Sequence, residues 1–189
     1  MAKINRELLT ILNDYELFMS SEKRTNLPFY VTQTKNNHPT SLYNTQSLTS
    51  EYEFGHVTID CEMRDKSPYN YSFQILTDKV QSRVLARLDE GNGTHRNNIP
   101  TIPLAEQEVT TPHFHKYNSS GIFIAYKTNS LIHKSGRPLA IGEGIGLFCE
   151  EENISLTEEE LAEAEEALAK EMGYADVDAM MADAGEDSV

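Results

Sequence analysis

Alternation of apolar and polar side chains with a period of two runs from Glu53 to Tyr126, and it constrains the fold more than any other feature. In FGHVTIDCEMR, Val57 and Ile59 alternate with polar neighbours, and YNYSFQIL and SRVLARLD repeat the pattern. HFHKY and GIFIAY follow after a polar excursion at residues 91–112. Because successive side chains of a strand point to opposite faces of a sheet, these segments predict half-buried strands joined by turns.

The N-terminal segment predicts a helix before these strands. Apolar side chains recur at steps of three and four over residues 4–20, which places them on one helical stripe. Pro28 follows, and we expect a short strand at 28–33 and a loop over the Asn-, Thr- and Ser-rich residues 34–52. This order predicts an α+β protein, in which the N-terminal helix packs on a mostly antiparallel sheet of about five to seven strands.

A glycine-rich stretch, SGRPLAIGEGIGLF, follows the last predicted strand. It contains four glycines, but it lacks the GK[ST] ending of a phosphate-binding loop and the GxGxxG pattern of a dinucleotide-binding turn. The glycines favour a loop that leads into a short closing element at residues 147–149.

Charge separates the chain into two parts. Residues 150–189 hold 15 of the 30 acidic side chains but one of the 16 basic ones, so the remainder is electrically balanced. Thr157 and Glu160 form a capping box, which predicts a helix at about 157–172 and a second at about 175–184. We therefore divide the chain into an α+β body, residues 1–155, and an acidic C-terminal helical appendage, residues 156–189. The appendage is either a solvated pair of helices or an element that forms a homodimer.

The remaining composition predicts a cytoplasmic location. The N-terminus lacks the apolar core of a signal peptide, and the chain has no apolar run long enough to span a membrane. Cys61 and Cys149 lie far apart in apolar surroundings, which is typical of reduced core thiols. Since the body is neutral, the acidity of the whole chain does not exclude an anionic ligand.

Ionisable side chains gather in two segments of the predicted sheet. RLDEGNGTHR carries a guanidinium and a carboxylate two residues apart, followed by a glycine turn and a histidine; PHFHKY places two histidines and a tyrosine on one strand face. If these strands pair, the side chains converge. The candidate catalytic residues are His95, His113 and His115, and the candidate ligand-binding residues are Arg87, Asp89, Arg96, Lys116 and Tyr117.

The string RLDEGNGTHRN, followed downstream by TPHFHKY, resembles an uncharacterised family of Gram-positive bacterial and phage proteins with RLDxxGxxHRN and PHxHxY motifs. The resemblance covers roughly residues 1–155 and implies no particular chemistry. The segment between His95 and His113 is longer than the family pattern, and the acidic helices are an addition to it. A looser likeness, in architecture and residue type, is to small bacterial toxin ribonucleases.

Three functions stay open from the residues. The first is a nucleic-acid- or nucleotide-directed enzyme, an RNase-like phosphodiesterase that needs no metal, in which two histidines act as acid and base and cationic side chains hold phosphate. The second is a non-catalytic, phage-encoded anti-defence protein that sequesters a nucleotide, or whose acidic tail binds a basic host protein such as a CRISPR effector. The third is a protein that binds Zn²⁺ or a similar ion through His95, His113 and His115.

Overall fold

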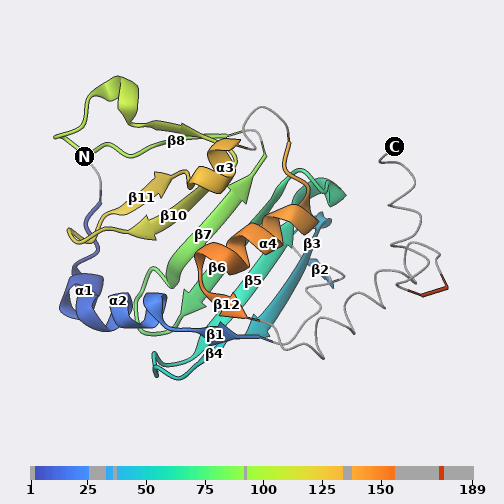
Figure 1. Ribbon diagram of the computed structural model, residues 1–189, viewed down its shortest axis with the longest axis horizontal. Coiled ribbons are helices and arrows are strands. Elements are labelled where there is room, and N and C mark those ends of the chain that lie inside the picture. Colours follow the sequence, from blue (N-terminus) through green and yellow to red (C-terminus); the bar gives the residue numbers. More distant parts are fainter. Residues whose placement is uncertain are drawn as a thin grey trace. The chain divides into compact units, whose positions relative to one another are not determined.

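The computed structural model is shown in Figure 1. It describes residues 3–25, 33–35, 38–91, 93–133, 138–155 and 175–176. These residues form an α+β fold, which confirms the predicted fold class. The helix predicted at 157–172, residues 177–184 of the helix predicted at 175–184, and residues 28–32 of the strand predicted at 28–33 lie outside the described part of the chain.

A seven-stranded sheet forms the centre of the body, in the order β11-β10-β7-β6-β5-β3-β2. Its strands are β2 (Gln33–Lys35), β3 (His38–Ser47), β5 (Val57–Met63), β6 (Tyr71–Thr77), β7 (Val84–Glu90), β10 (His113–Tyr117) and β11 (Phe123–Tyr126). Every neighbouring pair is antiparallel, as predicted.

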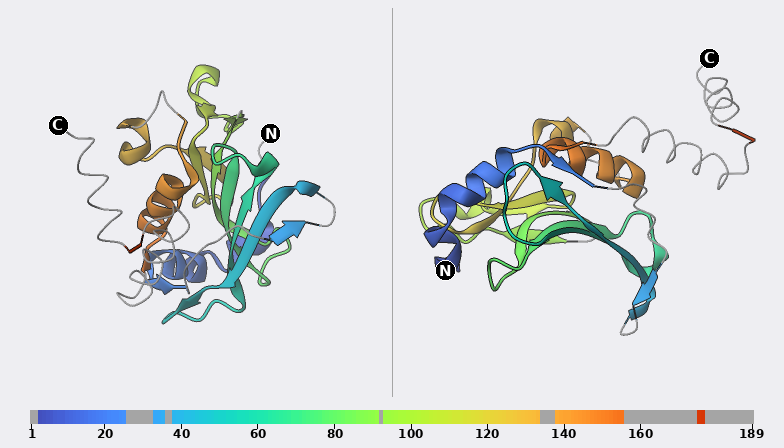
Figure 2. Two further views of the ribbon diagram at one scale, coloured as in Figure 1. Left: turned by 90° about the vertical axis from the view of Figure 1, so that its right-hand side faces the viewer. Right: turned by 90° about the horizontal axis from the view of Figure 1, so that it is seen from below.

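Helices cover one face of this sheet (Figure 2). They are α1 (Arg6–Thr10), α2 (Leu12–Ser20), α3 (Asn129–His133) and α4 (Ile141–Glu151). The N-terminal helix predicted over residues 4–20 is two helices that meet at Ile11. Phe73 of β6 and Phe114 of β10 stack against Phe148 of α4, and all three side chains are buried. The hydrophobic core therefore lies between the helices and the sheet.

The opposite face of the sheet is polar along whole rows of paired residues. Glu62, Ser72, Asp89 and His113 lie opposite one another on four successive strands. Paired residues of an antiparallel sheet point to the same face, so the polar half of the period-two pattern gathers there.

The loop predicted over residues 34–52 is wrong. This segment contains the whole ten-residue strand β3 and the short strand β4 (Thr49–Ser50). Strand β3 pairs with β5 over six residues, from Leu42 to Ser47. Its side chains are mostly exposed or half-buried, so backbone pairing rather than an apolar pattern defines the strand.

The loop predicted in the glycine-rich segment is also wrong, because Ile141–Glu151 is the helix α4. A Cβ atom added at Gly144 would lie 2.0 Å from the Tyr71 hydroxyl oxygen, so this glycine lets the helix approach β6 closely. Here tertiary packing overrides the low helix propensity of glycine.

The polar excursion at 91–112 has structure of its own. Strands β8 (Thr94–Arg96) and β9 (Glu108–Thr110) pair as a separate two-stranded ribbon, and a short 3-10 helix, η2 (Leu104–Glu106), precedes β9. We call residues 94–110 the ribbon. In Figure 1 it extends from the sheet beside β11.

A small second sheet joins the ends of the body. In it, β1 (Lys23–Arg24) pairs in parallel with β12 (Ile154–Ser155) and antiparallel with β4. The side-chain amine of Lys23 is fully buried and donates hydrogen bonds to three backbone carbonyls, those of Met19, Ser21 and Glu152.

A short 3-10 helix, η1 (Arg64–Lys66), follows β5 directly. Within the described residues, no helix is long and apolar enough to cross a membrane.

Candidate functional site

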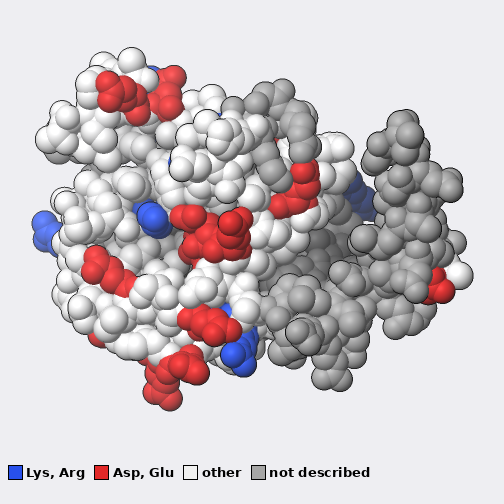
Figure 3. All heavy atoms as spheres, in the orientation of Figure 1, with Lys and Arg blue, Asp and Glu red and all other residues white. Residues whose placement is uncertain are grey.

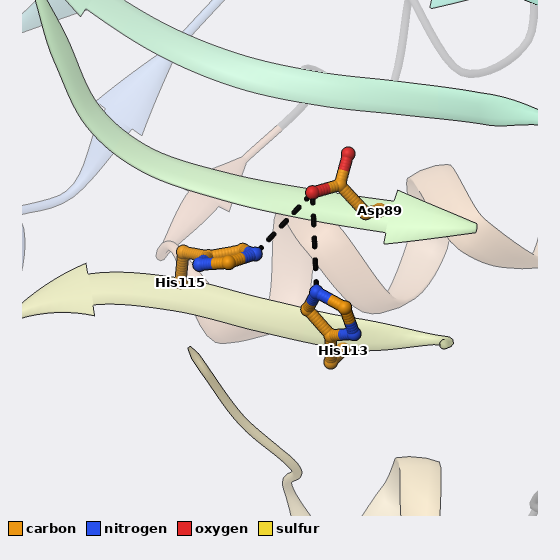
Figure 4. Close-up of side chains that lie close together, drawn as sticks. All are labelled: Asp89, His113 and His115. Carbon is orange, nitrogen blue, oxygen red and sulfur yellow. Dashed lines mark ion pairs between the residues drawn. The ribbon is translucent and has the colours of Figure 1, made fainter. Parts of the chain in front are cut away.

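Two neighbouring strands position the central side chains of the site. His113 and His115 lie on β10, directly opposite Asp89 and Arg87 of β7. All four occupy the polar face of the sheet, and Figure 4 shows Asp89 pointing toward the two imidazoles, with α4 behind the strands. Phe114, between the histidines, is fully buried in the core, as the period of two predicts.

The carboxylate of Asp89 links a guanidinium to two imidazoles. Its Oδ1 lies 2.7 Å from Nε and 2.5 Å from Nη2 of Arg87. Its Oδ2 lies 3.3 Å from Nε2 of His115 and 4.0 Å from Nε2 of His113. The side chains of Asp89, His113 and His115 are 13%, 5% and 6% exposed, so the cluster is almost fully shielded from solvent.

The ribbon brings His95 to this cluster. The His95 ring centroid lies 4.8 Å from that of His115 and 6.2 Å from that of His113, and the His113 and His115 centroids are 4.6 Å apart. Gly91, at φ +133°, turns the chain out of β7 toward the ribbon, in a backbone conformation that side-chain-bearing residues rarely adopt. The predicted convergence of three imidazoles is thus present.

Burial and charge set the ionisation of these groups. For Asp89, burial raises the pKa, but the hydrogen bond from His115 and the charge of Arg87 outweigh it, and the net pKa is lowered. Burial, together with the nearby His115, lowers the pKa of His113 to about 4. The same two causes lower the pKa of His95. At neutral pH the cluster therefore holds a charged carboxylate beside neutral rings at His95 and His113, which are free to accept a proton or bind an electrophile.

The cluster lines a cleft of about 790 Å³. A second arginine, Arg64 of η1, lies on its wall and donates a hydrogen bond to the Ser72 hydroxyl. The cleft is lined by Arg64, Asp65, Ser67, Tyr69, Asn70, Arg87, Asp89, Glu90, Gly91, Gly93, Thr94, His95, Thr111, His113, His115, Phe123 and Pro138. Arg64 was not predicted as a site residue from the sequence. It follows β5, which lies two strands from β7 in the sheet, and this position could have indicated that it lies near the site.

Three predicted ligand-binding residues lie elsewhere. Lys116 alternates with the histidines and therefore points to the helix side, where its amine lies 3.7 Å from a Glu151 carboxylate oxygen of α4. Arg96 pairs with Glu108 on the exposed side of the ribbon. Tyr117 shares the face of His115, but its hydroxyl hydrogen-bonds to the side chains of Asn5 and Ser82. All three residues were predicted because they lie next to the site residues in sequence. In the structure, the alternation of side chains along the strands and the contacts with other partners keep them out of the site.

Comparisons of the chain with family models, with curated proteins and with solved structures gave no match. The family resemblance stated from the motifs stays a prediction.

Proposed function

We propose that the body acts on a nucleic acid or nucleotide, as a phosphodiesterase that needs no metal ion. One observation carries the proposal: the Asp89 carboxylate bridges Arg87 and His115, and two further imidazoles lie beside them in one cleft. A carboxylate that orients an imidazole next to a guanidinium is a combination that suits proton transfer at a phosphate ester.

Arginine supplies the phosphate-binding part of the proposed site. Asp89 engages Nε and Nη2 of Arg87, and a guanidinium has five N–H donors, so further donors remain for an anion. Arg64 adds a second guanidinium on the cleft wall. Acidic side chains, by contrast, gather over α4 on the helix face of the sheet (Figure 3), which disfavours a polyanion there.

The proposed reaction is cleavage of RNA through its own 2′-hydroxyl. His95, half-buried on the cleft, removes the proton of the 2′-hydroxyl as its oxygen attacks phosphorus. The bond from phosphorus to the 5′-oxygen breaks, and the His115 imidazole, which the Asp89 carboxylate contacts at 3.3 Å, gives a proton to that oxygen. The products are a 2′,3′-cyclic phosphate and a 5′-hydroxyl, and general acid–base catalysis of this kind contributes about 10²–10⁴-fold.

The test uses an RNA oligonucleotide with a matched oligonucleotide that carries a 2′-deoxy residue at the cleavage position. We expect the protein to cleave the RNA in EDTA, to leave the deoxy position intact, and to lose activity in His95→Ala. His56→Ala is the matched control, since His56 is an exposed histidine outside the cleft. Absence of cleavage of RNA and of cyclic nucleotides, with and without divalent ions, contradicts the catalytic proposal. Nucleotide binding without turnover would instead identify a sequestering protein.

Binding of a divalent metal such as Zn²⁺ is the second candidate function, because Asp89, His113 and His115 each offer a ligand atom within 4.8 Å of the others. This set replaces the predicted trio, with Asp89 in the place of His95. Two features weigh against it: Arg87 already holds the Asp89 carboxylate, and Nδ1 of His115 has no hydrogen-bond partner among the described residues. Metal-bound histidines usually donate that second N–H to an acceptor. Elemental analysis of untagged protein decides, and stoichiometric zinc that disappears in Asp89→Asn supports this candidate.

A further inference from the structure

The ribbon that carries His95 does not pair with the seven-stranded sheet. Strands β8 and β9 pair with each other in a sheet of their own. At its base, the Thr111 hydroxyl donates a hydrogen bond to the Gly91 carbonyl, and the Thr111 amide donates to the Gly93 carbonyl at 3.1 Å. These contacts tie the base of the ribbon to the end of β7. A further contact, beyond His95, ties the ribbon to the sheet.

The side chain of Asn97 makes that contact. Its Nδ2 donates to the Ala125 carbonyl at 2.9 Å, and its Oδ1 accepts from the Ala125 amide at 2.7 Å. Ala125 belongs to β11, the edge strand of the sheet, and lies directly opposite His115. An edge strand presents unpaired N–H and C=O groups, so the carboxamide takes the place that a neighbouring strand would fill.

We propose that Asn97 is the positioning residue that holds His95 against His115. This inference rests on the proposed function for its catalytic consequence, but its structural part stands without it. Asn97 follows His95 by two residues, and the ribbon pairing continues there, since the Asn97 amide donates to the Gln107 carbonyl at 3.0 Å. Side chains two residues apart on a strand point the same way, so both point toward the sheet.

The chemistry of the contact explains the residue type. An amide supplies one donor group and one acceptor at the spacing of a peptide unit. Aspartate would retain the bond from the Ala125 amide but would place a charged oxygen against the Ala125 carbonyl. Alanine would remove both bonds. The three side chains therefore form a graded series.

The experiment measures the position of His95 directly. In protein with labelled histidine, NOEs between imidazole ring protons report His95 against His115, and His113 against His115. We expect Asn97→Ala to abolish the first NOE, Asn97→Asp to weaken it, and both variants to keep the second, since His113 and His115 share β10. Glu108→Gln is the matched control: it removes an ion pair of the same ribbon on the exposed side, and both NOEs should persist.

Kinetics add the catalytic consequence. If the chain cleaves RNA, Asn97→Ala should lower kcat by about 10²-fold, the effect expected for a reacting group misplaced by about 1 Å, with KM nearly unchanged because both arginines remain. A His95–His115 NOE that survives in Asn97→Ala overturns the inference. Loss of the His113–His115 NOE in that variant overturns it too, because Asn97 would then support the sheet rather than the ribbon. Absence of cleavage in the unmodified protein overturns the proposed function only.

Discussion

Replacing Asp89 with asparagine should destabilise the protein by about 2 kcal/mol at pH 7. The change removes the charge that Arg87 contacts at 2.7 and 2.5 Å and that His115 contacts at 3.3 Å. Hydrogen bonds to charged groups contribute about 1.5–3 kcal/mol, and breaking one half of a buried ion pair costs about 3–5 kcal/mol. Arg87 is 32% exposed, so water partly rehydrates its guanidinium and the lower range applies.

The pH dependence of this loss has a definite sign. The pKa of Asp89 is lowered in the folded protein. The charged carboxylate therefore stabilises the fold fully at pH values above the ordinary aspartate pKa, and this stabilisation is lost as the pH falls through the lowered pKa. The difference in unfolding free energy between the two proteins should therefore be largest near neutral pH and shrink as the pH falls below the ordinary aspartate pKa of about 3.9. Urea denaturation at several pH values measures it, and a melting temperature lower by roughly 4–8 °C should accompany it at pH 7.

Asp65→Asn is the matched control for this prediction. Asp65 lines the same cleft and is exposed, and asparagine tolerates its φ of 52°. Its effect should stay within about 0.5 kcal/mol. A loss in Asp89→Asn no larger than that of the control, or a difference that grows as the pH falls, would refute the account of Asp89 as a charged partner of Arg87.

Three other substitutions or reactions test the packing of the body. Gly144→Ala should lower the free energy of unfolding by about 1–3 kcal/mol, because the added Cβ would meet the Tyr71 side chain. Gly142→Ala should raise it by about 0.5–1 kcal/mol, because a Cβ there would have no atom within 4 Å. Thermal or urea unfolding measures both variants, and equal effects would contradict the close approach of helix and sheet. Lys23→Met should cost about 3 kcal/mol or more, since three backbone carbonyls lose their donor, and a loss below 1 kcal/mol would argue against that role. Burial raises the pKa of Cys61 to about 12, so a thiol reagent should label it only on unfolding, and rapid labelling of the native protein would contradict its burial.

The period-two pattern was enough to predict the centre of the sheet and the faces of its strands. It placed His113, His115 and Asp89 correctly because an antiparallel strand pair fixes which side chains share a face. The same rule, applied to Lys116, would have excluded that residue from the site, since it alternates with the histidines. Proximity along the chain was a weaker guide than strand parity.

Two errors came from reading composition as conformation. Strand β3 is polar because much of it is exposed on both faces, so no apolar alternation marks it. Helix α4 contains glycines because one of them, Gly144, makes room for Tyr71, a contact between residues far apart in sequence. In both segments, contacts with residues far away in the sequence determine the secondary structure, and a local sequence pattern does not indicate those contacts.

Our preference between the two proposed uses of the histidine cluster rests on Arg87. Without it, Asp89, His113 and His115 would form a negatively charged set of ligand atoms suited to a divalent cation. With the guanidinium on Oδ1, the charge of Asp89 is balanced, and a cation between the imidazoles would lie close to a fixed positive charge. An anion in the cleft would meet that charge favourably and would find Arg64 on the same wall. The geometry of one carboxylate, held on one side by arginine and on the other by histidine, is therefore the physical reason to favour a phosphate ester over a metal ion at this site.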